Sequence, residues 1–177
     1  MVKLLCAPVN DSGGSLTVYA LLEYAFRREF ECNIPEIKKT PVGKPYFPDR
    51  SDIHFSLSHS RTHVLCGLAD RPIGVDIESP RVLRDRVIEF FSSPEESKLF
   101  SPLELWVLKE SYIKLIGGSL PLVKTIRFSR NIEYIVAPEK TVAAKLYSIE
   151  HCTAAVCVDN DLCPDSFELI TSLTTPF

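Results

Sequence analysis

Alternation of apolar and polar residues predicts two β-strands, at residues 53–58 and 73–78. In each segment every second side chain is hydrophobic or small, so one face can be buried while the other carries polar groups. The largely apolar stretch at 1–9 predicts a first strand, and the continuous apolar run at 64–68 predicts a buried strand. The residues 70–72 (Asp-Arg-Pro) turn the chain from that buried strand into strand 73–78.

Residues 16–30 have the apolar content expected of a helix, and Ser15 stands where an N-cap is expected. A loop rich in proline and glycine follows at 41–48. Four short segments near the other end of the chain predict a β-meander; they lie at 124–129, 132–137, 142–149 and 152–158. We expect the last dozen residues to be held weakly.

A helical region is predicted over residues 81–117. Ser-Pro pairs at 93–94 and 101–102 divide it, because proline is favoured in the first turn of a helix and disrupts its interior. The longest piece, 103–116, is expected to end at the glycine pair 117–118.

The order of these elements is strand, helix and strands, followed by strand, helices and strands. It predicts an α+β fold built from two similar halves that meet near residue 70. The amino-terminal half would span residues 1–70 and the other half residues 71–177.

The composition is that of an ordinary globular protein, with 45% hydrophobic residues, 24% charged residues and a net charge of −3. This charge disfavours a general nucleic-acid binder, and no apolar run approaches the length of a membrane span. Residues 35–130 carry 15 basic and 12 acidic side chains, whereas 131–177 carry 2 and 7. An anionic ligand or partner near 35–130 would explain this excess, as would an ordinary mixed surface.

Six cysteines are scattered through the chain without a Cys-x-x-Cys pair. This spacing favours reduced thiols over a disulfide framework or a zinc site. The apolar run at 1–9 is too short for a secretory signal. We therefore expect a cytoplasmic protein.

Three acidic residues are candidates for a metal-binding site. Asp76 and Glu78 share one face of strand 73–78, and Glu110 lies one helical turn before Lys114. If that helix face crosses the strand, three carboxylates converge beside a lysine, and hard oxygen ligands of this kind suit Mg²⁺ with phosphate oxygens. Taken singly, the strand fits an acidic surface strand and the helix an ordinary Glu–Lys pair.

Hydroxyl and imidazole groups gather at the end of strand 53–58. Ser58 and His59, with exposed backbone N–H groups, can hold a phosphate, although serine is also common in plain turns. Gly43-Lys44-Pro45 is not a Walker A loop, because the preceding glycine and the following Ser or Thr are missing. Lys44 nevertheless offers a mobile positive charge.

Five motifs follow one another along the chain: Gly43-Lys44-Pro45, Phe55-x-x-Ser58-His59-Ser60, Ile73-Gly74-Val75-Asp76-Ile77-Glu78, Phe90-Phe91-Ser92 with Glu95 or Glu96, and Trp106-x-x-Lys109-Glu110-Ser111-x-x-Lys114. With them the segment 43–120 resembles the 4′-phosphopantetheinyl transferases of the surfactin-synthetase-activating type. The Asp-x-Glu and Trp-x-x-Lys-Glu-x-x-x-Lys motifs are the most specific part of this resemblance.

The resemblance implies transfer of the phosphopantetheine arm of coenzyme A to a serine of an apo acyl or peptidyl carrier protein, with release of adenosine 3′,5′-bisphosphate. It implies Mg²⁺, with Mn²⁺ as an alternative ion, and a pseudo-twofold pair of α+β halves with the cofactor in the cleft between them. Two fused halves favour a monomer. Carrier surfaces are typically acidic, in keeping with the positive excess at 35–130.

By matching position, the resemblance implies that Asp76, Glu78 and Glu110 hold the metal ion against the pyrophosphate. Glu110 would also accept the proton of the carrier serine, directly or through a metal-bound water. Lys114, and Lys109 at the helix edge, would offset the charge of the pyrophosphate. Glu110 and Lys114 are therefore the expected catalytic residues.

The residues that the resemblance implies for coenzyme A binding are Lys44 and Pro45 on the nucleotide side, Ser58 and His59 at the 3′-phosphate, and Asp76, Lys109 and Lys114 at the pyrophosphate. Relatives of this type usually have a longer amino-terminal segment rich in Lys and Arg, and then an arginine on the first helix. Ser15 or a neighbour stands there in this sequence. We therefore expect weaker coenzyme A binding than in such a relative, as calorimetry would measure.

Two other functions fit part of the sequence. A Mg²⁺-dependent phosphohydrolase or nuclease would also use acids on a strand and a helix, but it leaves Trp106, Lys114 and the Ser58-His59 pair without roles. A catalytically degenerate module that only binds coenzyme A or a carrier protein is the other. The intact acids and lysines count against it.

Overall fold

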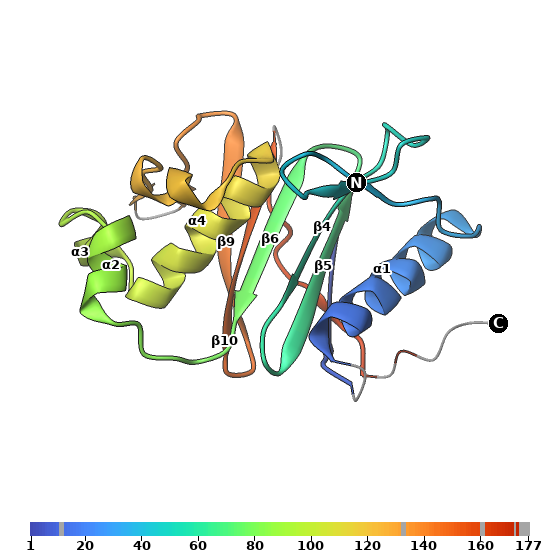
Figure 1. The fold of residues 1–177 in the computed structure, drawn as a ribbon, viewed down its shortest axis with the longest axis horizontal. Helices are drawn as coiled ribbons and strands as arrows, with labels where there is room; N and C mark the ends of the chain where they lie inside the picture. Colours follow the sequence, from blue (N-terminus) through green and yellow to red (C-terminus); the bar gives the residue numbers. More distant parts are fainter. Residues whose placement is uncertain (11–12, 132–133, 160–161, 172, 174–177) are drawn as a thin grey trace.

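The computed structural model describes residues 1–177 apart from 11–12, 132–133, 160–161, 172 and 174–177 (Figure 1). The helices of this described part are α1 (Gly14–Phe30), α2 (Asp85–Phe91), α3 (Glu96–Leu99), α4 (Pro102–Ile116) and the 3-10 helix η1 (Leu120–Lys124). The strands are β1 (Val2–Pro8), β2 (Lys38–Lys39), β3 (Pro45–Tyr46), β4 (His54–His59), β5 (His63–Ala69), β6 (Ile73–Glu78), β7 (Ser129–Arg130), β8 (Ile135–Val136), β9 (Val142–Ile149), β10 (Cys152–Asp159) and β11 (Glu168–Leu169).

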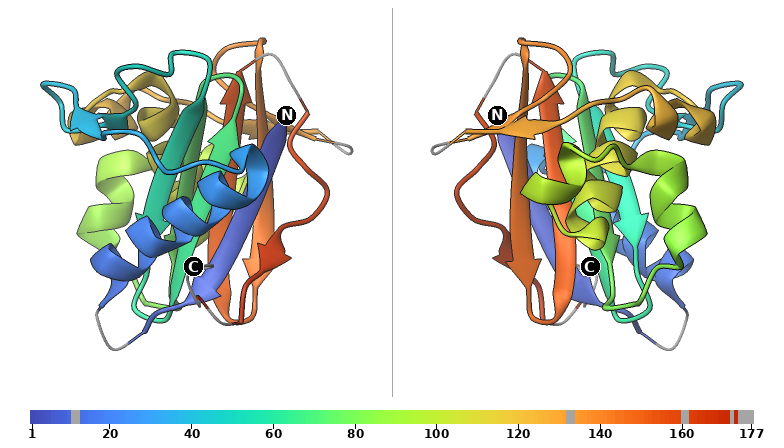
Figure 2. Two further views of the ribbon diagram at one scale, coloured as in Figure 1. Left: turned by 90° about the vertical axis from the view of Figure 1, so that its right-hand side faces the viewer. Right: turned by 90° about the vertical axis from the view of Figure 1, so that its left-hand side faces the viewer.

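Two sheets form the centre of this mixed α+β fold. The first has the strand order β11-β1-β5-β4 and the second β6-β10-β9-β8-β7, while β2 and β3 pair separately. All pairs are antiparallel except β1 with β11. Helix α1 covers the outer face of the first sheet and α4 covers that of the second (Figures 1 and 2).

The central strands are buried on both faces, which explains their continuous apolar runs. On β1, Leu5 packs in the cluster under α1, whereas Leu4 faces the second sheet. On β10, Cys157 packs under α4, whereas Val156 packs between the sheets. Three hydrophobic clusters therefore hold the layers together, one under each long helix and one between the sheets.

Helix α4 crosses β6 with its backbone in contact at Gly74. A Cβ atom at this position would lie 1.9 Å from the carbonyl oxygen of Ser111 and 2.4 Å from the amide nitrogen of Leu115. Such distances exclude a larger side chain unless the helix moves. The glycine therefore fixes how closely α4 approaches the strand that carries Asp76 and Glu78.

The edge strands β4 and β6 face each other across the junction of the two sheets, and two serine hydroxyls bridge them. Ser56 Oγ accepts the backbone N–H of Val75 at 3.0 Å, and Ser58 Oγ accepts that of Ile77 at 3.3 Å. Because β6 pairs only with β10 in its sheet, these N–H groups would otherwise lie buried without a partner. The junction is thus specified by side chains of β4.

The long helices begin and end close to where the sequence predicts. Ser101 forms a capping box with Glu104 at the start of α4, and Gly117, with a φ of 66°, ends the helix. The prediction of Ser15 as the N-cap of α1 was wrong. The helix starts two residues earlier than predicted, at Gly14, with Gly13 as a cap that makes no side-chain hydrogen bond.

The predicted strand at 124–129 was largely wrong, because the chain there completes η1 and then runs irregularly to the two-residue strand β7. The apolar side chains Val123, Ile126 and Phe128 pack into the cluster beneath α4, which accounts for the strand-like pattern without a ladder. Of the segment predicted at 132–137, strand β8 forms at Ile135–Val136, and 132–133 lie outside the described residues.

The carboxyl-terminal segment is held more firmly than expected. Strand β11 pairs in parallel with β1, the N–H of Ile170 donates to Cys6 O at 2.7 Å, and Arg28 of α1 pairs with Glu168. Residues 172 and 174–177 lie outside the described part. Among the residues that are described, no helix is both long and apolar enough to cross a membrane.

Candidate active site

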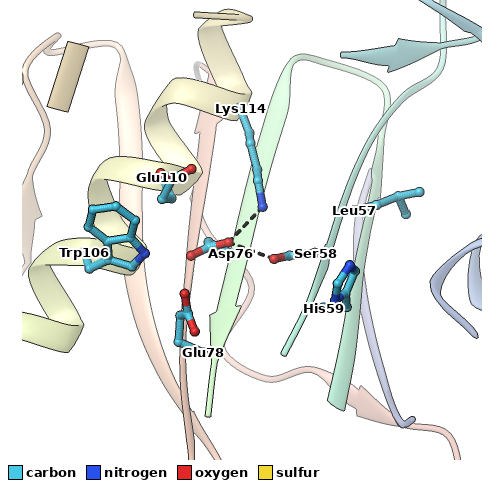
Figure 3. Close-up of a pocket in the computed structure, with 8 residues that line it drawn as sticks. All are labelled: Leu57, Ser58, His59, Asp76, Glu78, Trp106, Glu110 and Lys114. Atoms are coloured by element: carbon cyan, nitrogen blue, oxygen red, sulfur yellow. Dashed lines mark hydrogen bonds and ion pairs between the residues drawn. The ribbon is translucent and has the colours of Figure 1, made fainter. Parts of the chain in front are cut away.

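A pocket of about 310 Å³ opens where β4, β6 and α4 meet (Figure 3). It brings together polar residues that are far apart in the sequence. Its walls are Leu57, Ser58 and His59 from β4, Asp76 and Glu78 from β6, and Trp106, Glu110 and Lys114 from α4.

The periodicities of the strand and the helix explain this convergence. Asp76 and Glu78 share one face of β6 while Val75 and Ile77 are buried on the other. On α4, Glu110 and Lys114 are one turn apart, and Lys114 reaches from the helix to Asp76 on β6 (Figure 3).

Asp76 is the centre of the hydrogen bonding in the pocket. Its Oδ1 atom accepts from Ser58 Oγ at 2.7 Å and from Lys114 Nζ at 2.8 Å. Its Oδ2 atom is buried and has no hydrogen-bond partner among the described residues. Buried carboxylate oxygens are normally satisfied, so Oδ2 offers a ready acceptor for a cation or a donor that enters the pocket.

The carboxyl groups of Glu110 and Glu78 lie in surroundings that disfavour their negative charge. Burial raises the pKa of Glu110, the charges of Asp76 and Glu78 raise it further, and Lys114 lowers it. Burial also raises the pKa of Glu78, against the effect of Arg81. A cation placed among the three acids would relieve this repulsion.

A second pocket, of about 450 Å³, adjoins the first and shares Leu57, Glu110 and Lys114 with it. Lys44 and Pro45 line its far side. Lys44 Nζ donates to the carbonyl oxygen of Leu115 at 2.8 Å, near the carboxyl end of α4, and burial lowers its pKa. The two neighbouring pockets are together called the groove below.

The donor set fits a magnesium ion, although the side chains do not form a closed cage. No three Asp, Glu, His or Cys side chains of the described residues are gathered as a metal cluster. Mg²⁺ needs no such cage, since it is usually held by one or two carboxylates together with water and substrate phosphates. The Oδ2 atom of Asp76, which has no partner among the described residues, and the carboxyl of Glu110, whose pKa burial raises, match that requirement.

A family model described as the 4′-phosphopantetheinyl transferase superfamily matches residues 72–161, just over half of the 177-residue chain. This segment contains β6, α4 and all three pocket acids. The chain belongs to the 4′-phosphopantetheinyl transferase superfamily.

Curated members of this superfamily match the chain over part of their length. The 4′-phosphopantetheinyl transferase gsp of Aneurinibacillus migulanus is 37% identical over 102 residues, which cover 50% of this chain and 42% of that protein. The 4′-phosphopantetheinyl transferase Sfp of Bacillus subtilis (strain 168) is 32% identical over 125 residues, or 64% and 56% of the two chains. A 4′-phosphopantetheinyl transferase of Bacillus subtilis is 40% identical over 91 residues, or 45% and 40%. The chain spans about half the length of the curated relatives it matches.

Most residues expected from the transferase motifs line the groove. Those in the first pocket are Ser58, His59, Asp76, Glu78, Glu110 and Lys114, and those in the second are Lys44 and Pro45, again with Glu110 and Lys114. Four of the five motifs are thus brought to one place, whereas the Phe90-Phe91-Ser92 motif contributes no lining residue to either pocket.

Lys109 is the exception, and the expectation that it faces the cofactor has to be corrected. Its side chain is 0% exposed, and Nζ pairs with Glu96 at 3.0 Å while donating to the carbonyl oxygens of Phe91 and Val123. One residue along a helix turns the side chain by about 100°. Lys109 therefore points into the core under α4 while Glu110 points into the pocket.

Ser58 and His59 line the pocket in different ways from each other. The Ser58 hydroxyl donates to Asp76 and accepts from Ile77 N–H, so it holds the carboxylate in place from the opposite sheet. His59 is exposed, and its ring lies close to Gly14 at the start of α1. Of the two, His59 has the side chain that is open to a ligand.

Two residues that shape the site were not singled out from the sequence. Ser56 bridges β4 to β6, and Arg81 pairs with Glu78 at 2.7 Å. Glu96 was named as a motif residue, but its pairing with Lys109 was not expected. Arg81 is three residues beyond Glu78, a spacing that pairs side chains only when the intervening loop allows it. No signal in the sequence identifies the Ser56 contact, which joins two different sheets.

Proposed function

We propose that this chain transfers the 4′-phosphopantetheine group of coenzyme A to a serine of an apo acyl or peptidyl carrier protein. The observation that carries this proposal is the pocket of Asp76, Glu110 and Lys114, which lies within the segment matched by the superfamily model. Adenosine 3′,5′-bisphosphate is the leaving group. The serine Oγ forms a bond to the phosphorus that carries the pantetheine arm. The bond from that phosphorus to the bridging oxygen breaks, and the oxygen leaves with adenosine 3′,5′-bisphosphate.

We also propose that the fold consists of two pseudo-twofold halves, at 1–70 and 71–177, with the coenzyme A cleft between them. The arrangement of one long helix on the outer face of each sheet supports this. So does the lining of the groove by β3 and β4 on one side and by β6 and α4 on the other. The division is not complete, because strand β11, from the segment 71–177, pairs in the sheet of the first half.

Asp76, Glu78 and Glu110 would hold Mg²⁺, or Mn²⁺ in its place, which would neutralise charge on the pyrophosphate. The chain supplies the remaining positive charge. Lys114 lies in the pocket beside Asp76, and Lys44 lies where the groove continues towards the nucleotide. His59 would contact the 3′-phosphate. Positioning and charge neutralisation are the main requirements of phosphoryl transfer.

Glu110 would accept the proton of the carrier serine. Its carboxylate lines the pocket beside Lys114, within the site proposed for the pyrophosphate, and positioned carboxylates act as general bases. Lys114, one turn further along α4, would keep positive charge near the pyrophosphate while the proton moves.

The proposed reaction needs a carrier protein and coenzyme A, and neither a nucleic acid nor a membrane. One chain supplies both walls of the groove, which supports a monomer. Six free thiols support a reducing, cytoplasmic setting.

The test is to incubate the full chain with an apo carrier protein, coenzyme A and Mg²⁺ and to weigh the carrier by mass spectrometry. The proposal predicts a gain of one phosphopantetheine group that stops when Mg²⁺ is chelated. Hydrolysis of coenzyme A without transfer would point instead to a phosphohydrolase. Binding of coenzyme A without either reaction would point to a binding module.

A further inference from the structure

An ion pair at the rim of the pocket ties Glu78 to a residue that the proposed reaction does not use. Arg81 Nη2 donates to Glu78 Oε1 at 2.7 Å. The Arg81 guanidinium also lies over the ring of Trp106, 5.9 Å from its centroid, within the range of a cation–π contact. It therefore connects a residue of β6 to a residue of α4 from the loop between β6 and α2.

Asp76 and Glu78 each pair with a cation, one inside the pocket and one at the exposed rim. Asp76 pairs with Lys114 inside the pocket. Arg81, in contrast, sits on the exposed segment between β6 and α2, with a side chain 46% exposed, while that of Glu78 is 25% exposed. A guanidinium at this place occupies one Glu78 oxygen and repels a divalent cation that approaches it.

We propose that Arg81 is a positioning residue that holds the Glu78 carboxylate in an ion pair at the rim of the pocket and thereby sets how tightly the pocket takes Mg²⁺. A cation that recruits Glu78 competes with this arginine for the carboxylate. The inference rests on the proposed function in one respect, namely that the pocket binds a divalent cation.

The neighbouring side chains allow Glu78 to exchange Arg81 for a cation as its partner. Arg81 keeps the Trp106 ring as a partner when Glu78 turns away. Glu78 already lines the pocket, and its neighbours across the sheet on β10 are small, with Thr153 opposite Glu78 and Ala155 opposite Asp76. A change of side-chain rotamer is therefore enough to move the carboxylate, with no change in the strand.

Trp106 provides a readout that does not depend on activity. It is the single tryptophan of the chain, it lines the pocket, and its side chain interacts with Glu78. If Glu78 and Arg81 move, the environment of the Trp106 ring changes. Tryptophan emission of the full chain, without coenzyme A, can therefore be followed as MgCl₂ is added.

The experiment compares the Mg²⁺ concentration at half-saturation in four proteins: wild type, R81A, E78Q and the double variant R81A/E78Q. We expect R81A to saturate at about threefold lower Mg²⁺, the size of effect that a partly exposed ion pair can have. In the E78Q background the same change should have no effect, because Arg81 acts through Glu78. Calorimetry checks the half-saturation values, since R81A also alters the emission of Trp106 directly.

R84A is the matched control, because Arg84 is an exposed arginine of the same loop, and it should saturate as wild type does. Equal half-saturation in wild type and R81A would overturn the inference. An R81A effect that persists with E78Q would also overturn it, since the arginine would then act only through its general charge. Failure of wild type to bind Mg²⁺ would overturn it too, whereas transfer to a carrier, measured separately by mass, decides the proposed function.

Discussion

Lys109 and Glu96 form a buried ion pair beneath α4, with 3.0 Å between Nζ and Oε2 and side chains 0% and 2% exposed. Glu96 also accepts the backbone N–H groups of Ser93 and Phe128. The pair therefore joins α3 and the segment before β7 to the helix that carries Glu110. Its role is to hold the scaffold of the pocket, since neither side chain reaches the pocket itself.

We expect K109M to lower the free energy of unfolding by about 3–5 kcal/mol, because it leaves the Glu96 carboxylate buried without its cation. The double variant K109M/E96Q should recover part of this loss. Urea unfolding of the three proteins measures both effects. A loss below about 1 kcal/mol for K109M would show that water or another cation replaces the lysine.

Ser58 and Ser56 make a matched pair for testing how Asp76 is positioned. Both accept an N–H of β6, but only the Ser58 hydroxyl also donates to Asp76. S58A and S56A should each destabilise the fold by about 1–3 kcal/mol, the cost of leaving a buried donor without a partner. Only S58A should weaken Mg²⁺ binding as well. Calorimetry of both variants checks this, and equal Mg²⁺ affinities would show that Ser58 does not position Asp76.

Gly74 should tolerate no side chain, because a Cβ atom there would meet the backbone of α4 at 1.9 Å and 2.4 Å. We expect G74A to cost about 3 kcal/mol or more in thermal or urea unfolding, at the upper end of overpacking effects. It should also displace Glu110 from Asp76. G67A is the comparison, since its Cβ would meet the Val75 and Ile73 side chains, at 2.7 Å and 2.8 Å, rather than backbone. A smaller cost for G74A than for G67A would contradict the close helix crossing.

Buried thiols should make the fold sensitive to alkaline pH. Burial raises the pKa of Cys6, Cys66 and Cys157 from 9.0 to about 12. Between these values the folded chain binds more protons than the unfolded chain, so the stability contributed by the neutral thiols is complete below pH 9 and is lost as the pH rises towards 12. Each thiol contributes a slope of up to about 1.4 kcal/mol per pH unit.

Urea unfolding across this pH range measures the slope. C66A should make it shallower by removing one of the three thiols, whereas C32A, at an exposed cysteine, should leave it unchanged. An identical slope in wild type and C66A would show that Cys66 does not ionise on unfolding.

The sequence pattern predicted the parts of the site that depend on a single periodicity. Alternation along 73–78 placed Asp76 and Glu78 on one face, and helical spacing placed Glu110 with Lys114. The same helical spacing indicates that Lys109 is buried. It lies four residues after Leu105 and three before Tyr112, on the helix face whose apolar residues are buried. We expected Lys109 at the cofactor because it is next to Glu110 in the motif, although adjacent helix residues point in different directions.

Contacts between distant segments could not be predicted in this way. The Glu96 partner of Lys109 and the Ser58–Asp76 hydrogen bond join elements whose relative placement follows from packing alone. The pattern at 124–129 misled for the same reason, since Ile126 and Phe128 are buried by packing against α4 and not by strand pairing. Periodicity shows which side chains are buried, but it does not show what buries them.

The rate of carrier modification by E110Q tests whether Glu110 accepts the proton of the carrier serine. Glu110→Gln keeps the shape of the side chain and removes its ability to accept a proton. The account predicts at least about a hundredfold loss of rate, the usual contribution of a general base. E36Q, at an exposed acid outside the pocket, should keep the wild-type rate. Transfer by E110Q at the wild-type rate, measured as phosphopantetheine gained by the carrier over time, would contradict the account.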